Sequence, residues 1–136
     1  NFESAPTEKG VTLHHFGDGA ILVDRLMFRR ALSNLLSNAL RHSKNHSDVT
    51  IDISDTAQAV IVTVENTGED IDPQIIPRLF DRFYRADPSR LHPQSDGAGL
   101  GLSITRAIAQ AHGGRVTVES GAGRTKFSLE FPSRLL

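Results

Sequence analysis

The chain has 136 residues with a formal net charge of −1, and 38% of them are hydrophobic, which suits one domain with one core. A nearly neutral chain without a concentrated basic stretch is not drawn to nucleic acid or to an anionic membrane. The absence of cysteine excludes disulfides, thiolate metal sites and a cysteine nucleophile, and no apolar run approaches the ~20 residues that cross a bilayer.

The first half of the chain begins with a polar lead-in at residues 1–10, which we expect to be frayed. Asp24 is a suitable N-cap for a strong amphipathic helix over residues 25–42. Pro73 suits the first turn of a short helix that runs to about Phe80. Alternating apolar residues predict four strands in this half, at residues 11–15, 20–23, 49–54 and 59–65.

The second half opens with residues 84–98, which hold two prolines and little periodicity and predict a long loop of the functional kind. A helix over residues 100–112 follows, with Gly113 and Gly114 as its C-terminal stop. Residues 115–120 and 125–131 predict a final pair of strands. Strands and helices are mixed without regular β-α-β alternation, so we expect a single domain, an α/β sandwich with a mixed sheet covered on one face by helices.

The helix over residues 25–42 carries polar side chains beside its apolar face. At ~100° per residue, Asn34, Asn38 and Arg41 stack together at the border of the core face. An asparagine oxygen can bind Mg²⁺, its amide can donate to a phosphate, and Arg41 can take a phosphate oxygen. Solvated or capping amides explain the helix alone about equally well.

Asn66 lies at the end of a predicted strand and shares the parity of Val60, Val62 and Val64, so it should point into the same layer. A glycine turn follows at Gly68. An amide in this place can read the edge of a base, its oxygen accepting from an adenine amino group. An ordinary turn remains the simpler explanation of this motif alone.

Three alternate glycines, Gly97, Gly99 and Gly101, open directly into the helix at residues 100–112. A helix N-terminus offers unpaired N–H groups and a positive dipole end, and glycine lets the backbone approach a phosphate closely. The spacing matches neither the dinucleotide fingerprint nor a Walker loop. A flexible hinge is the alternative explanation.

Together these motifs resemble the conserved boxes of sensor histidine kinases, in register from about residue 10 to Pro132. The resemblance joins NLLSNALRH to the N box, ENTG to G1, LFDRFYR to F, GAGLGL to G2 and TKF to the closing motif, at residues 34–42, 65–68, 79–85, 97–102 and 125–127. It implies the Bergerat ATP-binding fold of such kinases, with a five-stranded mixed sheet, three helices on one face and residues 84–98 as an ATP lid. The stretch FYRADPSR at residues 83–90 is similar to heavy-metal (copper, silver, zinc) sensor kinases.

The resemblance also implies roles for individual residues, with ATP and Mg²⁺ as the bound groups. Asn38 matches the Mg²⁺ ligand, Asn34 supports the metal and phosphates, and Arg85 matches a lid arginine near the γ-phosphate, so Asn38 and Arg85 carry the catalytic role. The remaining matched nucleotide-binding positions are Arg41, His42, Asn66, Gly68, Ile71, Tyr84, Gly97, Gly99, Leu100, Gly101, Leu102 and Thr125.

Three positions depart from the pattern of the family. Asn66 stands where an acid usually reads adenine, and Asp70 replaces the second glycine of the G1 box. Arg124 stands where a small residue is usual. An asparagine oxygen can still accept from the adenine amine, although that contact loses its charge.

The expected function is to bind Mg-ATP and present its γ-phosphate to a histidine on a separate phosphoacceptor and dimerisation domain, with onward transfer to a response regulator. No histidine here has the sequence context of an acceptor. The alternatives are a Bergerat-fold ATPase and a degenerate nucleotide-responsive interaction module. In the ATPases a glutamate activates water at the place of Asn34, and an amide cannot act as that base.

The sequence begins without an initiator methionine, so we interpret it as a piece of a longer protein. The resemblance implies a cytoplasmic domain of an inner-membrane kinase that is homodimeric when intact, the isolated domain being monomeric. It implies no nucleic-acid partner.

Overall fold

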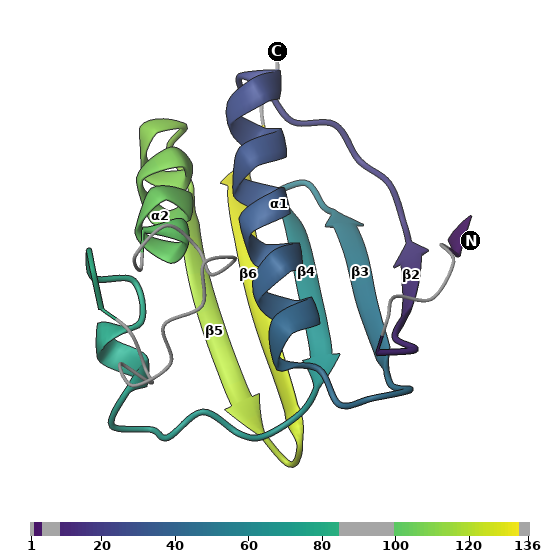
Figure 1. Ribbon diagram of the computed structural model, residues 1–136. Helices are drawn as coiled ribbons and strands as arrows, with labels where there is room; N and C mark the ends of the chain where they lie inside the picture. Colours follow the sequence, from purple (N-terminus) through teal and green to yellow (C-terminus); the bar gives the residue numbers. More distant parts are fainter. Residues whose placement is uncertain (1, 4–8, 85–99, 134–136) are drawn as a thin grey trace.

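The computed structural model describes residues 2–3, 9–84 and 100–133, and all statements below refer to these. Its elements follow the order β1 Phe2–Glu3, β2 Thr12–Phe16, α1 Arg25–His42, β3 Asp48–Asp55, β4 Ala59–Thr67, η1 Ile76–Arg78, α2 Gly101–Ala111, β5 Arg115–Gly121 and β6 Arg124–Pro132. Helices α1 and α2 lie on one face of a single sheet (Figure 1). The expected α/β sandwich is therefore confirmed.

The sheet has the strand order β1-β2-β3-β4-β6-β5. Only the β2–β3 pair is parallel, and the other pairs are antiparallel. Five strands, β2 to β6, make up the expected mixed sheet, and the two-residue β1 adds a short edge next to β2. Helix α1 is the crossover that the parallel pair requires.

Helix α1 forms where the apolar spacing predicts it. The Asp24 side chain accepts a hydrogen bond from the Met27 N–H at 2.9 Å, which confirms the predicted N-cap. The face that carries Ala31, Leu35 and Ala39 is fully buried against the sheet. The core continues through the inward side chains of the central strands and of α2, including Val49, Val62, Val64, Leu102, Ile108, Ala109, Phe127 and Leu129.

Two expectations about the elements are wrong. Residues 20–23 form no strand, because β2 already pairs with β1 on one side and with β3 on the other. These residues instead connect the end of β2 to the start of α1, which lies on the face of the sheet. Ile21 and Val23 pack on the core, while Leu22 is 71% exposed. The alternation of these residues therefore reflects side-chain packing on the core and not hydrogen bonding to a neighbouring strand.

The third helix predicted after Pro73 is a single 3₁₀ turn, η1, so the described residues contain two α-helices rather than three. Pro77 explains the difference. It has no N–H to donate within an α-helix, and it disfavours the helical conformation of the residue before it.

Candidate functional site

The two helices run antiparallel and are joined at both ends. The Asn34 amide nitrogen donates to the Gly101 carbonyl at 3.1 Å and lies 3.4 Å from the Thr105 hydroxyl. At the other end, the Asp24 N–H donates to His112 Nε2 at 3.2 Å. Helix α2 thus begins level with Asn34, and the last turns of α1 extend beyond it, as Figure 1 shows.

The extended part of α1 carries the other polar residues of the predicted site. Asn38 lies one turn beyond Asn34, half-buried, and its amide makes no hydrogen bond with the described residues. Arg41 is half-buried on the same side, and His42 is exposed at the helix end. The Asn38 oxygen is therefore available to a ligand, whereas the Asn34 nitrogen is engaged by α2.

Lys9 holds the C-terminal end of α1. Its ammonium donates to the carbonyls of Leu40 at 3.2 Å, Arg41 at 2.7 Å and Ser43 at 3.1 Å. A helix end leaves its last carbonyls without intrahelical partners and favours a positive charge. Sequence reasoning missed this residue, because a contact across more than thirty positions leaves no local pattern.

Asn66 lies at the end of β4, between Val49 of β3 and Thr125 of β6. The residue is 3% exposed, and its side-chain amide makes no hydrogen bond with the described residues. Among the described residues, no fully buried side-chain nitrogen or oxygen lacks a hydrogen-bond partner. A nearly buried amide that no described residue engages is suited to a ligand.

The turn after β4 is pressed against the end of α1. A Cβ atom on Gly68 would collide with the His42 carbonyl oxygen, so only glycine fits there. The Lys44 N–H donates to the Thr67 carbonyl at 2.9 Å. These contacts set Asn66 beneath the same last turn of α1 that carries Arg41 and His42.

The β5–β6 turn closes the other side of Asn66. Asp70 accepts from the Gly123 N–H at 2.8 Å, and the Gly68 N–H donates to the Gly123 carbonyl at 2.9 Å. Ala122 and Gly123 have φ values of 56° and 79°, the left-handed pair of a two-residue hairpin turn. Asp70, which departs from the glycine of the family pattern, thus locks this turn.

Two hydroxyl groups, those of Ser120 and Thr125, also connect the segment after β4 to strands β5 and β6. Ser120 Oγ lies 2.8 Å from Thr125 Oγ1 and accepts from the Ile71 N–H at 2.8 Å. Thr125 is buried beside Asn66, so the structure brings Thr125 and Ile71 into the same region. Arg124, the other departure, is largely exposed and reaches Glu65 at 3.5 Å on the solvent face of the sheet, where residue size is unrestricted.

The segment before residue 85 is anchored in the core. Phe80 meets Phe127 edge-on, with ring centroids 6.0 Å apart. The Arg78 guanidinium lies 4.7 Å from the centre of the Tyr84 ring, so Tyr84 is held by its own segment. Phe83 stays 60% exposed. This anchoring fixes the end of the described segment at Tyr84.

The remaining predicted site residues lie at the start of α2 or outside the described residues. Arg85, Gly97 and Gly99 belong to the second group. Leu100 precedes α2, which begins at Gly101 with no side-chain cap on its first N–H groups. Such groups suit a phosphate. Leu102 points into the core, so only its backbone can face a ligand.

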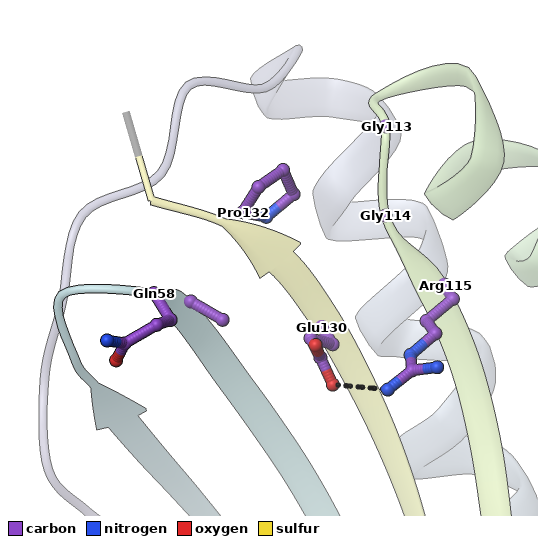
Figure 2. Close-up of a pocket in the computed structure, with 7 residues that line it drawn as sticks. Gln58, Gly113, Gly114, Arg115, Glu130 and Pro132 are labelled. Atoms are coloured by element: carbon purple, nitrogen blue, oxygen red, sulfur yellow. Dashed lines mark hydrogen bonds and ion pairs between the residues drawn. The ribbon is translucent and has the colours of Figure 1, made fainter. Parts of the chain in front are cut away.

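A hollow of about 210 Å³ lies at the opposite end of the sheet, where β4 and β5 begin and β6 ends. Figure 2 shows Gln58, Gly114 and Pro132 around it and the Arg115–Glu130 pair, 3.3 Å apart, at its side. None of the predicted site residues lines it. This hollow is therefore separate from the site around Asn38 and Asn66.

In the part of the chain that the structure describes, no three His, Asp or Glu side chains gather closely enough to hold a metal ion. A cation at the end of α1 would therefore depend on amide oxygens, water and the ligand itself. The Asn38 amide, which no described residue engages, fits such a donor set for Mg²⁺. No described helix is long and apolar enough to cross a membrane.

Comparison with known proteins adds an independent finding. Residues 23–135 match the family model of histidine kinase-, DNA gyrase B- and HSP90-like ATPases. Sensor histidine kinase CusS of Escherichia coli O157:H7 is 46% identical over 134 residues, which cover 98% of this chain and 28% of that protein. The probable sensor kinase SilS of Salmonella typhimurium is 43% identical over 93% of this chain and 26% of its own length.

Solved structures agree with the fold. The catalytic domain of histidine kinase ThkA superposes with a TM-score of 0.77 and 27% identity, covering 92% of this chain and 80% of that one. Full-length ShkA in complex with AMPPNP gives a TM-score of 0.74 at 27% identity, over 95% of this chain and 27% of that one. The chain therefore belongs to the family of histidine kinase-, DNA gyrase B- and HSP90-like ATPases.

Proposed function

We propose that this domain binds Mg-ATP between the last turns of α1, the end of β4 and the start of α2, and presents the γ-phosphate to a histidine on a separate domain. The observation that carries the proposal is a pair of amides that form no hydrogen bond with any described residue. Asn38 projects from the part of α1 that extends past α2, and Asn66 ends β4 nearly buried. One amide suits the metal and phosphates, and the other suits the base.

Each residue has a role set by its contacts. The Asn38 oxygen binds Mg²⁺, which neutralises charge on the phosphates. Asn34 uses its nitrogen to hold Gly101 at the start of α2, so it contributes only its oxygen to the metal site and otherwise positions the phosphate-binding N–H groups. Arg41 and His42 flank the nucleotide from the last turn of α1. Asn66 faces the base.

The lid residues complete the site in this proposal. Arg85 contacts the γ-phosphate, and Gly97, Gly99 and Leu100 form the backbone cradle with Gly101. The contribution of the domain to the reaction is to hold the terminal phosphate in line with its acceptor and to neutralise its charge.

Transfer is favoured over hydrolysis because of Asn34. A hydrolytic site needs a base to take a proton from water, and an amide does not act as one. The Asn34 amide is moreover engaged with Gly101, which leaves it no freedom to orient a water molecule through its nitrogen.

The chain spans only about a quarter of the length of the sensor kinases that it matches, so their wider properties are part of the proposal. We propose that the acceptor histidine lies in a dimerisation domain of the same protein, which is homodimeric and membrane-bound with this domain in the cytoplasm. A response regulator then receives the phosphoryl group. The named activity of the relatives, sensor histidine kinase, supports this assignment.

Titration with AMPPNP, with and without Mg²⁺, tests the proposal. Asn38→Ala should weaken Mg²⁺-dependent binding by at least about tenfold. Ser37→Ala is the matched control, because Ser37 is the exposed neighbour on the same helix. Equal affinity with and without Mg²⁺, or equal effects of the two variants, would contradict the proposed site.

A further inference from the structure

We infer that the base site accepts 6-oxopurine nucleotides as well as ATP, because residue 66 is an amide that no described residue orients through a hydrogen bond. This inference rests on the proposed nucleotide site. The Asn66 side chain is 3% exposed, and no described residue forms a hydrogen bond with either of its amide atoms. Nothing among the described contacts therefore fixes which atom faces the ligand.

The chemistry of an amide allows both orientations. Asparagine carries an acceptor oxygen and a donor nitrogen, and its terminal torsion is broad and roughly two-fold. With the oxygen toward the 6-position, it accepts from the adenine amino group while its nitrogen can donate to N1. Turned by half a circle, the nitrogen donates to the oxygen of a 6-oxopurine and the oxygen accepts from its N1–H.

A carboxylate at the same position could not do this. An ionised aspartate only accepts hydrogen bonds, so it would face the oxygen of a 6-oxopurine with another oxygen. Asn66 therefore allows either a 6-amino or a 6-oxo group on the purine, and Asn66→Asp should restrict the site to a 6-amino group.

None of the described neighbours holds the amide in one orientation through a hydrogen bond. The turn after Asn66 is fixed by other partners, since Gly68 bonds Gly123 and Thr67 bonds Lys44. The Thr125 hydroxyl is paired with Ser120 at 2.8 Å. The Asn66 amide is thus not needed to hold its own strand end, and reorienting it breaks no hydrogen bond with the described residues.

Competition binding with ATP and ITP tests the inference, because ITP differs from ATP in carrying an oxygen at position 6 and lacks the 2-amino group of GTP. The wild-type chain should bind the two within about tenfold of each other. Asn66→Asp should raise the ratio of the ITP to the ATP dissociation constant by a further factor on the order of ten to a hundred, the effect of leaving one buried polar group unpaired.

Asn45→Asp makes the same chemical change on an exposed loop residue and should leave the ratio unchanged. Asn66→Ala should weaken the binding of both nucleotides to a similar extent. A wild-type preference for ATP above about a hundredfold, or a ratio that Asn66→Asp leaves unchanged in a folded variant, would overturn the inference while the ATP site stands. Failure of ATP itself to bind would instead overturn the proposed function. If Asn66→Asp does not fold, the wild-type ratio and Asn66→Ala decide.

Discussion

Replacing Lys9 by methionine tests how the end of α1 is held. Methionine keeps an unbranched apolar chain of similar reach but removes the ammonium that donates to Leu40, Arg41 and Ser43. A hydrogen bond from a charged group contributes about 1.5–3 kcal/mol, and a cation at a helix C-terminus about 0.3–1 kcal/mol. Because three carbonyls share one half-buried ammonium, these terms do not add, and we expect a loss of about 2 kcal/mol.

Thermal and urea unfolding measure this loss. For a chain of this size, about 2 kcal/mol corresponds to a fall of roughly 8 °C in Tm. Amide hydrogen exchange should speed up first at the last turn of α1, where the carbonyls lose their donor. Lys44→Met is the matched control, because Lys44 is an exposed lysine in the loop that follows α1. This substitution should change the free energy of unfolding by less than about 0.5 kcal/mol. Equal losses for both variants, or no loss for Lys9→Met, would refute the assigned role of Lys9.

Three further substitutions probe the contacts around the site. Gly68→Ala should destabilise by about 1–3 kcal/mol in urea unfolding, since its Cβ meets the His42 carbonyl, whereas Gly121→Ala, with open space at its Cβ, should be tolerated far better. Asp70→Ala should cost about 1 kcal/mol and speed hydrogen exchange of the β5–β6 turn amide; unchanged exchange would contradict that contact. Thr105→Val keeps the shape of a fully buried side chain but removes its hydroxyl, so we expect the free energy of unfolding to fall by about 1–2 kcal/mol. An unchanged free energy would show that the contact between α1 and α2 does not depend on this hydroxyl.

Local patterns predicted the elements that depend on local physics. The apolar stripe of residues 25–42 and the Asp24 cap defined α1, because both the spacing and the capping atom lie within one stretch of sequence. Residues 20–23 misled for the opposite reason. Their alternation is the same whether the chain pairs in a ladder or packs along the core, and only the partners of β2 decide between the two.

The site could be predicted as a set of residue types but not as a set of contacts. Asn38 and Asn66 were predicted as site residues from their place at a core border and at a strand end, and they stay a prediction. That Asn34 ties α1 to α2, that Lys9 caps α1 and that Asp70 locks the β5–β6 turn all depend on residues more than thirty positions apart. Such contacts follow from the tertiary fold, which periodicity and caps do not encode.

Delivery of a phosphoryl group from Mg-ATP to a histidine can be followed in a single transfer assay. The chain is mixed with a matching phosphoacceptor domain and ATP labelled in the γ-phosphate, and label on the acceptor histidine is followed with time. We expect Mg²⁺-dependent labelling that disappears with Asn38→Ala and persists with Ser37→Ala. Rapid release of free phosphate without an acceptor, or labelling that survives Asn38→Ala, would contradict it.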